Sequence, residues 1–212
     1  QSGLALLVED SDELRHQFRD MLVDLGLSVI EATSADEALV LATSLDGISL
    51  ILSDIRLEGA ATGIDLIERL ALPIPVILMT GHGDIPSSVR AIKEGAVDFL
   101  TKPFSEAELI AAVEAAVALD RESRAARAEL AALRRRYDGL TPREREVLPL
   151  VVSGLLNKQA AAELGISEVT LQIHRRNVMS KMAAASLADL VRIAERLEIP
   201  VTHSRRPLGG AS

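Results

Sequence analysis

Cysteine and tryptophan are absent from this chain, and aromatic residues make up only 2% of it. Without cysteine the protein can form no disulfide, no thiolate metal site and no cysteine nucleophile. The scarcity of aromatic rings argues against recognition of nucleic acid by stacking bases on aromatic side chains. No apolar run is long enough to cross a membrane, and the first residues lack a signal-peptide pattern. We therefore expect a cytoplasmic protein with no membrane partner.

Charge is plentiful, and it is divided by position. Residues 1–120 contain 21 Asp and Glu against 7 Lys and Arg, a net charge of −14. Residues 121–212 contain 10 against 16, a net charge of +6. An acidic front half can hold a divalent cation, and a basic back half can meet phosphates. The overall charge of −8 therefore does not exclude a nucleic-acid partner.

The front half alternates short apolar runs with amphipathic stretches. The runs are Leu4–Val8, Leu27–Glu31, Leu50–Ser53, Pro75–Met79 and Val97–Leu100, and the stretches are 11–25, 35–44, 63–70 and 85–94. Strands that alternate with helices predict an α/β fold with a doubly wound, five-stranded parallel sheet covered by helices on both faces.

The back half is predicted to be entirely helical. The chain from Ser105 to Tyr137 has neither Pro nor Gly, which favours one long helix, and a heptad stripe runs along it from Leu109. The stripe is compatible with a paired coiled coil; alternatively, the first half packs on the sheet and the second half is a solvated spacer. Shorter helical patterns follow at 142–153, 157–164, 168–182 and 186–197.

These patterns predict a division of the chain into four parts. We expect a first domain at 1–120, a helical linker at 121–138, a small all-α domain at 139–199 and a disordered tail at 200–212.

Polar residues follow four of the five predicted strands. Glu9 and Asp10 follow the first strand, Asp54 the third, Thr80 the fourth and Lys102 the fifth. The carboxyl ends of parallel strands form the reactive edge of a doubly wound sheet. Converging carboxylates repel one another, and Mg²⁺ would relieve that repulsion. Asp54 could accept a phosphoryl group, with Lys102 and Thr80 bound to its oxygens.

The segments "VED", "LSDIRL", "MTGHGD" and "VDFLTKPF" carry these residues, and they resemble the motifs of a response-regulator receiver domain over about residues 3–120. The resemblance implies that a sensor histidine kinase phosphorylates Asp54. It also implies that Mg²⁺ is bound by Asp10, Asp54 and the backbone carbonyl of Arg56, with Glu9 reaching it through water.

The same resemblance implies that Thr80 and Phe99 change position on phosphorylation, although Phe99 can also be read as an ordinary core aromatic. Glu9 stands where the family often has Asp, and the stretch Arg56–Gly63 is one residue longer than usual and lacks a proline. Arg56 and His82 are candidates for tuning the lifetime of the acyl phosphate; His82 is otherwise an exposed loop residue.

The segment from Asn157 to His174 has the pattern of a helix-turn-helix. Gly165 suits the tight turn, and Ser167 can cap the second helix. That helix presents side chains suited to the edges of bases and to phosphates in the major groove of DNA. They are Gln172, Ile173, Arg175, Arg176, Asn177 and Lys181.

The segments "LTPREREVL", "NKQAAAELGIS", "TLQIHRRNVMSKM" and "SLADLVRIA" resemble the LuxR-type output domain of the FixJ/NarL family over about 139–197. The resemblance implies base contacts from Gln172, Ile173 and Arg176. It implies phosphate contacts from three further residues, namely Arg175, Asn177 and Lys181. His174 is expected to have a packing role.

Together these features predict a DNA-binding transcription regulator, not an enzyme, that is controlled by phosphorylation of Asp54. Its expected partners are a sensor histidine kinase, double-stranded promoter DNA and, in the active state, a second copy of the chain. The copies could pair through the linker helix, through 85–94 with 97–100 and the start of 105–137, or through the first helix.

Two other functions are compatible with some of these features. A phosphatase of the haloacid-dehalogenase type would use a similar Asp, Thr and Lys, but it needs a second Asp where Arg56 stands. The second alternative is a protein-interaction adaptor whose helical domain does not bind DNA.

Overall fold

The computed structural model describes residues 3–59, 61–81 and 85–200 of the 212-residue chain. The chain divides into two compact units, Gln1–Ala125 and Ala126–Ser212, and the division falls inside the long helix. The predicted domain limits at residues 120 and 138 stay predictions. From residue 201 on, the predicted disordered tail lies outside the described residues, as does His82.

The first unit is built on a five-stranded parallel sheet with the strand order β2-β1-β3-β4-β5. Its strands are β1 Leu4–Val8, β2 Ser28–Ala32, β3 Ile48–Asp54, β4 Val76–Thr80 and β5 Asp98–Thr101. The connecting helices are α1 Asp12–Asp24, α2 Ala35–Ser44, α3 Gly63–Arg69 and α4 Ile85–Lys93. The predicted doubly wound fold is confirmed.

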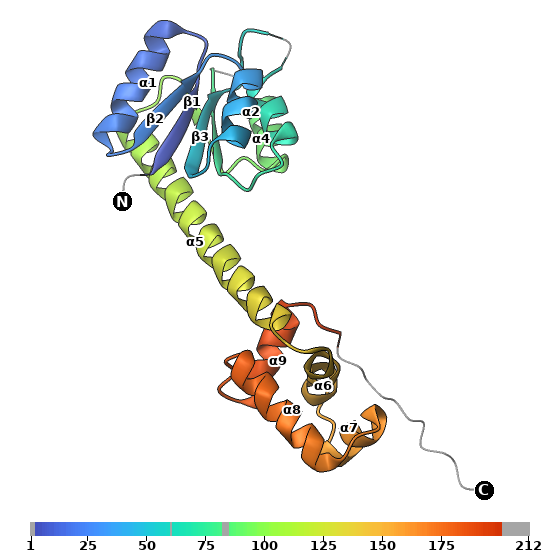
Figure 1. The fold of residues 1–212 in the computed structure, drawn as a ribbon. Helices are drawn as coiled ribbons and strands as arrows, with labels where there is room; N and C mark the ends of the chain where they lie inside the picture. Colours follow the sequence, from blue (N-terminus) through green and yellow to red (C-terminus); the bar gives the residue numbers. More distant parts are fainter. Residues whose placement is uncertain (1–2, 60, 82–84, 201–212) are drawn as a thin grey trace, which may run out of the picture. The chain divides into compact units, whose positions relative to one another are not determined.

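The three central strands, β1, β3 and β4, are buried on both faces, and alternate residues enter different cores. On β1, Leu6 and Val8 join a cluster with residues of α2, α3 and α4, whereas Ala5 and Leu7 join a cluster with residues of α1 and α5. Figure 1 shows α1 and α2 on opposite sides of the sheet. Burial on both faces explains why the strands read as continuous apolar runs.

Four of the five strands differ from their predicted limits: β2, β4 and β5 lie one residue later, and β3 is longer at both ends. Strand pairing does not depend on hydrophobicity. β3 continues to Asp54, which pairs in register with Met79, and β5 continues to Thr101, which pairs with Thr80. An apolar run marks the buried part of a strand, whereas the backbone ladder includes polar end residues as well. These polar ends carry the candidate site.

The long helix α5, Glu106–Asp138, uses most of its heptad stripe inside its own chain. Leu109, Ala112 and Ala116 are buried against the sheet of the first unit. Near the other end, Leu133 is buried, with Leu130 and Tyr137 packed beside it, in the core of the second unit. The second half is therefore not a fully solvated spacer. The remaining stripe, Leu119 to Ala126, is short for a paired coiled coil.

A partly buried ion pair fixes α5 to the sheet near the division between the units. Asp120 is buried, and its Oδ2 accepts a hydrogen bond of 2.7 Å from Nε of Arg124. Arg124 also donates from Nη2 to the backbone carbonyl of Ile48, at the start of β3, over 2.7 Å. The side chain of Arg124 thus ties the helix to the strand that ends in Asp54.

The second unit is helical, with α6 Pro142–Val152, α7 Asn157–Leu164, α8 Glu168–Lys181 and α9 Leu187–Arg196. Its core includes Val147, Leu171 and Leu190, all fully buried. Gly165 ends α7 in the left-handed region, with φ of 65°, which explains the glycine at the turn before α8. Ser167 caps α8 by accepting the N–H of Thr170 over 3.1 Å. In the described part of the chain, no helix is long and apolar enough to span a membrane.

We expect the substitution Gly63→Ala to destabilise the first unit by about 1–3 kcal/mol, because overpacking at a buried site costs this much. A Cβ atom at Gly63 would lie 2.2 Å from the backbone carbonyl oxygen of Asp54, which cannot easily move away. Chemical denaturation would measure the loss. Gly81→Ala is the matched control, since a Cβ atom there meets no atom of the described residues within 4 Å. Equal stability of the two variants would contradict the expectation.

Candidate functional site

Three predicted residues meet at the carboxyl edge of the sheet. The ammonium group of Lys102, just after β5, donates to Oε2 of Glu9 over 2.9 Å and contacts Oδ2 of Asp54 at still closer range. The Glu9 side chain is only 1% exposed, and Asp54, the last residue of β3, is 9% exposed. β4 separates β3 from β5, so the Lys102 side chain reaches past the end of β4. One cation thus compensates two buried carboxylates from strands far apart in sequence.

Asp10 and Arg56 lie at the same edge with different partners. Oδ2 of Asp10 accepts the backbone N–H of Glu58 over 2.7 Å, and Oδ1 of Asp54 accepts the backbone N–H of Arg56 over 3.0 Å. These bonds hold the loop after β3 between the two acidic strands. Among the residues that the structure describes, no group of three or more Asp, Glu or His side chains is arranged to hold a metal ion. The predicted ligands share an edge but do not yet surround one point.

Burial and ion pairing act against each other on the pKa values at this edge. Burial raises the pKa of Glu9 above its ordinary value, although hydrogen bonds from Lys102 and from the N–H of Ser11 partly offset that rise. Burial by itself would lower the pKa of Lys102, but its hydrogen bonds to Asp54 and Glu9 outweigh burial and raise it. Lys102 therefore stays charged at neutral pH.

Thr80 and Phe99 occupy neighbouring strands. Thr80 ends β4; it is buried, and its hydroxyl donates to the carbonyl of Gly81 over 2.9 Å. Phe99 lies on β5, where it pairs with Leu78, and its side chain is 39% exposed. The reading of Phe99 as a core aromatic is therefore wrong. The hydroxyl and the ring lie on adjacent strands, as the predicted switch requires.

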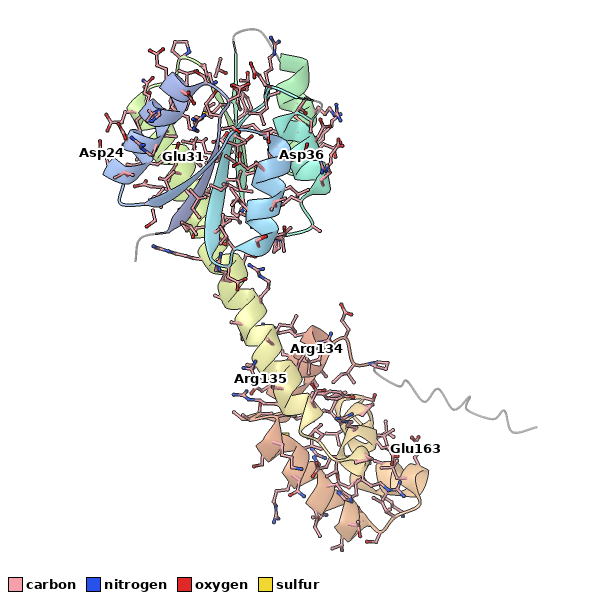
Figure 2. The ribbon with its side chains drawn as sticks, turned by 45° about the horizontal axis from the view of Figure 1, so that its top comes forward. Asp24, Glu31, Asp36, Arg134, Arg135 and Glu163 are labelled. Atoms are coloured by element: carbon pink, nitrogen blue, oxygen red, sulfur yellow. The ribbon has the colours of Figure 1, made fainter. Side chains whose placement is uncertain are left out.

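Arg15 is hydrogen-bonded to the backbone of Glu9 at the acidic edge, and the sequence alone did not predict this role. From α1, Nη1 donates to the backbone carbonyl of Glu9 over 2.9 Å, and Nε donates to Glu31 of β2 over 3.0 Å. Figure 2 labels Glu31 beside α1. Arg15 also pairs with Asp12. Nothing in the sequence distinguishes Arg15 from an ordinary charged residue of an amphipathic helix.

An apolar hollow of about 350 Å³ lies beside Lys102 and was also missed. The rings of Phe18 on α1 and Phe104 before α5 stack with centroids 5.2 Å apart, and Nζ of Lys102 is 5.6 Å from the Phe18 centroid. Leu14 and Met21 complete its apolar lining. Two of the three phenylalanines of the chain thus lie next to Lys102.

In the second unit, α8 carries the predicted DNA-contacting residues, and most of them are exposed. Gln172, Ile173, Arg176, Asn177 and Lys181 are exposed, whereas Arg175 and His174 are half-buried. Nδ1 of His174 is buried and has no hydrogen-bond partner among the described residues. The burial of His174 agrees with its expected packing role.

Two of the predicted phosphate-contacting residues are hydrogen-bonded inside the unit. Nη1 of Arg175 donates to Oδ1 of Asn157 on α7 over 2.9 Å. Nζ of Lys181 donates to Oε2 of Glu144 on α6 over 2.7 Å, and that carboxylate also accepts the N–H of Thr141 over 2.8 Å. The two bonds connect α8 to both neighbouring helices. They therefore fix the orientation of α8, whatever else these side chains contact.

Glu144 is a residue that the sequence reasoning did not single out. It is 2% exposed and lies in the first turn of α6, where it forms a capping box with Thr141. The hydrogen bond from Lys181 is the main cause that lowers the pKa of Glu144 below its ordinary value. The capping pattern Thr-x-x-Glu is visible in the sequence, but its ionic partner lies 37 residues away.

Comparison with known proteins identifies both units. Residues 5–114 match the response regulator receiver domain family, and residues 138–194 match the bacterial regulatory proteins of the luxR family. The chain is 45% identical to nodulation protein W of Bradyrhizobium diazoefficiens, over 96% of this chain and 90% of that protein. It is 42% identical to the transcriptional regulatory protein FixJ of Azorhizobium caulinodans, over 89% of this chain and 90% of that protein.

Solved structures agree with this assignment. The response regulator StyR, known at low resolution, has a TM-score of 0.77 and 37% identity, covering 92% of this chain and 100% of that chain. Full-length FixJ from B. japonicum has a TM-score of 0.56 and 36% identity, covering 94% of this chain and 100% of that chain.

The chain belongs to the response regulators that join a receiver domain to a LuxR-type DNA-binding domain. The predicted function, transcription regulation that depends on phosphorylation, is confirmed at the level of the family. This is a family of transcription factors and not of enzymes, so the phosphatase alternative is excluded. The receiver domain implies a histidine kinase as partner, and the second domain implies DNA.

We expect Lys102→Met to destabilise the first unit by about 1–3 kcal/mol, since removing one partner leaves a buried polar group unsatisfied. Glu9 and Asp54 would then repel each other without the ammonium group between them. Added Mg²⁺ should stabilise this variant more than the parent chain, because both cations compensate the same carboxylates. Thermal unfolding with and without Mg²⁺ measures both effects. The exposed Lys93→Met is the control, and a Lys102 variant that behaves like it would disprove the argument.

We expect Lys181→Met to destabilise the second unit by about 1–3 kcal/mol at pH 7, because the buried Glu144 loses its cation. A carboxylate whose folded pKa is lowered stabilises the fold above its unfolded pKa, and this contribution is lost as the pH falls through the folded pKa. The stability difference between parent and variant should therefore shrink below pH 4.5, the ordinary value. Hydrogen exchange of the α6 and α8 amides, measured as a function of pH, would report this stability difference. Lys158→Met, exposed on α7, serves as control.

Proposed function

We propose that Asp54 is the phosphoryl acceptor of this response regulator, and that Lys102, Thr80 and Phe99 carry out the chemistry and the switch. The observation that carries the proposal is the contact of the Lys102 ammonium group with both Asp54 and Glu9. A cation held against the acceptor oxygen is in place to bind an oxygen of the incoming phosphoryl group.

The transfer itself needs little covalent chemistry from the protein. An oxygen of Asp54 attacks the phosphorus of a phosphohistidine on the kinase; an O–P bond forms as the N–P bond breaks, and the histidine leaves. Oδ1 of Asp54 is oriented by the N–H of Arg56. Lys102 then binds a phosphoryl oxygen, and the Thr80 hydroxyl exchanges the Gly81 carbonyl for another.

We propose Asp10, Asp54 and the backbone carbonyl of Arg56 as ligands of Mg²⁺, with Glu9 acting through water. The donors fit this ion, because they are oxygen atoms from carboxylates and a carbonyl at one edge of the sheet. Asp10 can bind the ion through Oδ1 while Oδ2 keeps the N–H of Glu58. When bound, the ion neutralises charge on the phosphoryl oxygens.

The kinase is proposed to dock over the hollow beside Lys102. Its apolar lining by Leu14, Phe18 and Met21 of α1 gives a partner a surface to bury next to the acceptor. Asp54 is only slightly exposed, so the phosphodonor must approach from this edge.

The switch is proposed to act through α4 and β5. Val89 and Ile92 on α4 and Phe99 on β5 are exposed apolar residues, and α4 lies against β5. If the Thr80 hydroxyl moves to the phosphate, the ring of Phe99 can turn into the space beside it, which changes this surface. We propose that two phosphorylated copies pair here, in preference to the short stripe of exposed residues on α5.

The paired copies are proposed to place two α8 helices on DNA in the cytoplasm. Gln172, Ile173 and Arg176 are exposed on α8 and suit base edges, and Asn177 is exposed beside them. Arg175 and Lys181 are proposed as phosphate contacts in addition to their internal bonds. The half-sites would lie about 34 Å apart for recognition helices separated by one turn of DNA.

We expect Asp54→Asn to abolish phosphorylation completely, because an amide oxygen is not a phosphoryl acceptor. Incubation with acetyl phosphate and Mg²⁺, followed by intact mass measurement, should show one labile phosphoryl group on the parent chain and none on the variant. Light scattering should show that only the phosphorylated parent chain forms dimers. The phosphorylated parent should also bind promoter DNA more tightly than the variant. The exposed Asp46→Asn should behave like the parent. Full phosphorylation of Asp54→Asn would refute the proposal.

A further inference from the structure

The recognition helix α8 exposes two β-branched apolar residues one turn apart. Val169 is 69% exposed and Ile173 is 53% exposed. Residues four apart on a helix lie one above the other on the same face. The two side chains therefore form a short apolar ledge at the amino-terminal end of α8. Of these two residues, the sequence predicted a base contact for Ile173 but not for Val169.

The ledge is not needed for packing. Leu171, Val178 and the following Met182 are fully buried and anchor α8 in the core of the unit. An exposed Val is also a poor choice for a helix, because its branched side chain loses rotamer freedom there. A polar or straight-chain residue at position 169 would suit the isolated domain better. A contact outside the domain explains why Val is present.

Val169 lies on the face that carries the proposed base contacts. Gln172, Ile173 and Arg176 follow it by three, four and seven residues, which is the spacing of one helix face. Arg175 and Lys181 are hydrogen-bonded to α7 and α6. By contrast, the side chains of Gln172 and Arg176 form no hydrogen bond or ion pair within the described residues. The internally bonded residues fix the helix, and the other face is available to a ligand.

The chemistry of this face matches the major groove. Gln172 suits adenine and Arg176 suits guanine, whereas a β-branched apolar side chain suits the C5-methyl group of thymine. In a helix-turn-helix the amino-terminal residues of the second helix meet the base edges, and Val169 is the second residue of α8.

We propose that Val169 is a specificity-determining residue that contacts a thymine methyl group, next to the base that Ile173 meets. The inference rests on the proposed binding of DNA by α8. It assigns the operator a second thymine per half-site.

The test begins with the full chain, treated with acetyl phosphate, and a random library of DNA duplexes. Enriched duplexes are then rebuilt with deoxyuridine in place of each thymidine in turn, which removes one methyl group and nothing else. For the parent chain, two positions per half-site should each weaken binding about four-fold, as expected for one buried methyl group. With Val169→Ala, affinity for the unmodified duplex should fall about ten-fold, and deoxyuridine at one of the two positions should have no further effect.

Controls separate this inference from the proposed function. Ile173→Ala should abolish the deoxyuridine effect at the other position only, and Val40→Ala, an exposed Val on α2, should leave both effects unchanged. Ala favours helix, so Val169→Ala keeps its fold. If Val169→Ala shows the parent's affinity and both deoxyuridine effects while Arg176→Ala weakens binding, this inference is wrong and DNA binding stands. If the parent chain enriches no duplex, both are wrong.

Discussion

The acidic edge of the first unit depends on one cation. Glu9 follows β1 and Asp54 ends the adjacent parallel strand β3, and their buried carboxylates would repel each other if the Lys102 ammonium group did not lie against both. Lys102 follows the strand at the far edge, so the ion pairs join β1, β3 and β5 across the end of β4. The same arrangement suits the proposed role of Asp54 as phosphoryl acceptor, because a phosphoryl group brings negative oxygens to a site that already holds a positive charge. Stability and the proposed function would thus use one contact.

Much of the fold could be predicted from the sequence because hydrophobic periodicity reports burial directly. β1 was predicted to the residue, since both of its faces are buried and Gly3 and Glu9 flank its apolar run. The limits of β3 and β5 shifted because their last residues are polar but still pair with β4. The heptad stripe of α5 was ambiguous, because the same spacing serves a second helix, a sheet or the core of another unit.

The candidate site was predictable only where chemistry and topology coincide. Glu9, Asp54 and Lys102 were found because parallel strands bring their carboxyl ends to one edge. Arg15 and Glu144 were missed because each pairs with a charged residue on another element, Glu31 and Lys181 respectively, and no local pattern marks an ion pair of that kind. The exposure of Phe99 was undecidable from sequence, since a strand residue can face either side of its sheet or lie at its edge.

Both units compensate a buried glutamate with a lysine, but the two pairs have different consequences. Lys102 is shared between Glu9 and the proposed acceptor Asp54, so a phosphoryl group on Asp54 would compete for the ammonium group and change the charge balance at the edge. Among the described residues, Lys181 forms an ion pair with Glu144 alone. Because the Glu144 carboxylate is also held by the capping box of α6, this pair fixes the orientation of α8. A switch needs a contact that can be redistributed, and a reader of DNA needs a rigid helix. The surface of α8 that can discriminate between bases is therefore smaller than its row of basic residues suggests. It consists of the side chains that neither pack in the core nor bond to neighbouring helices.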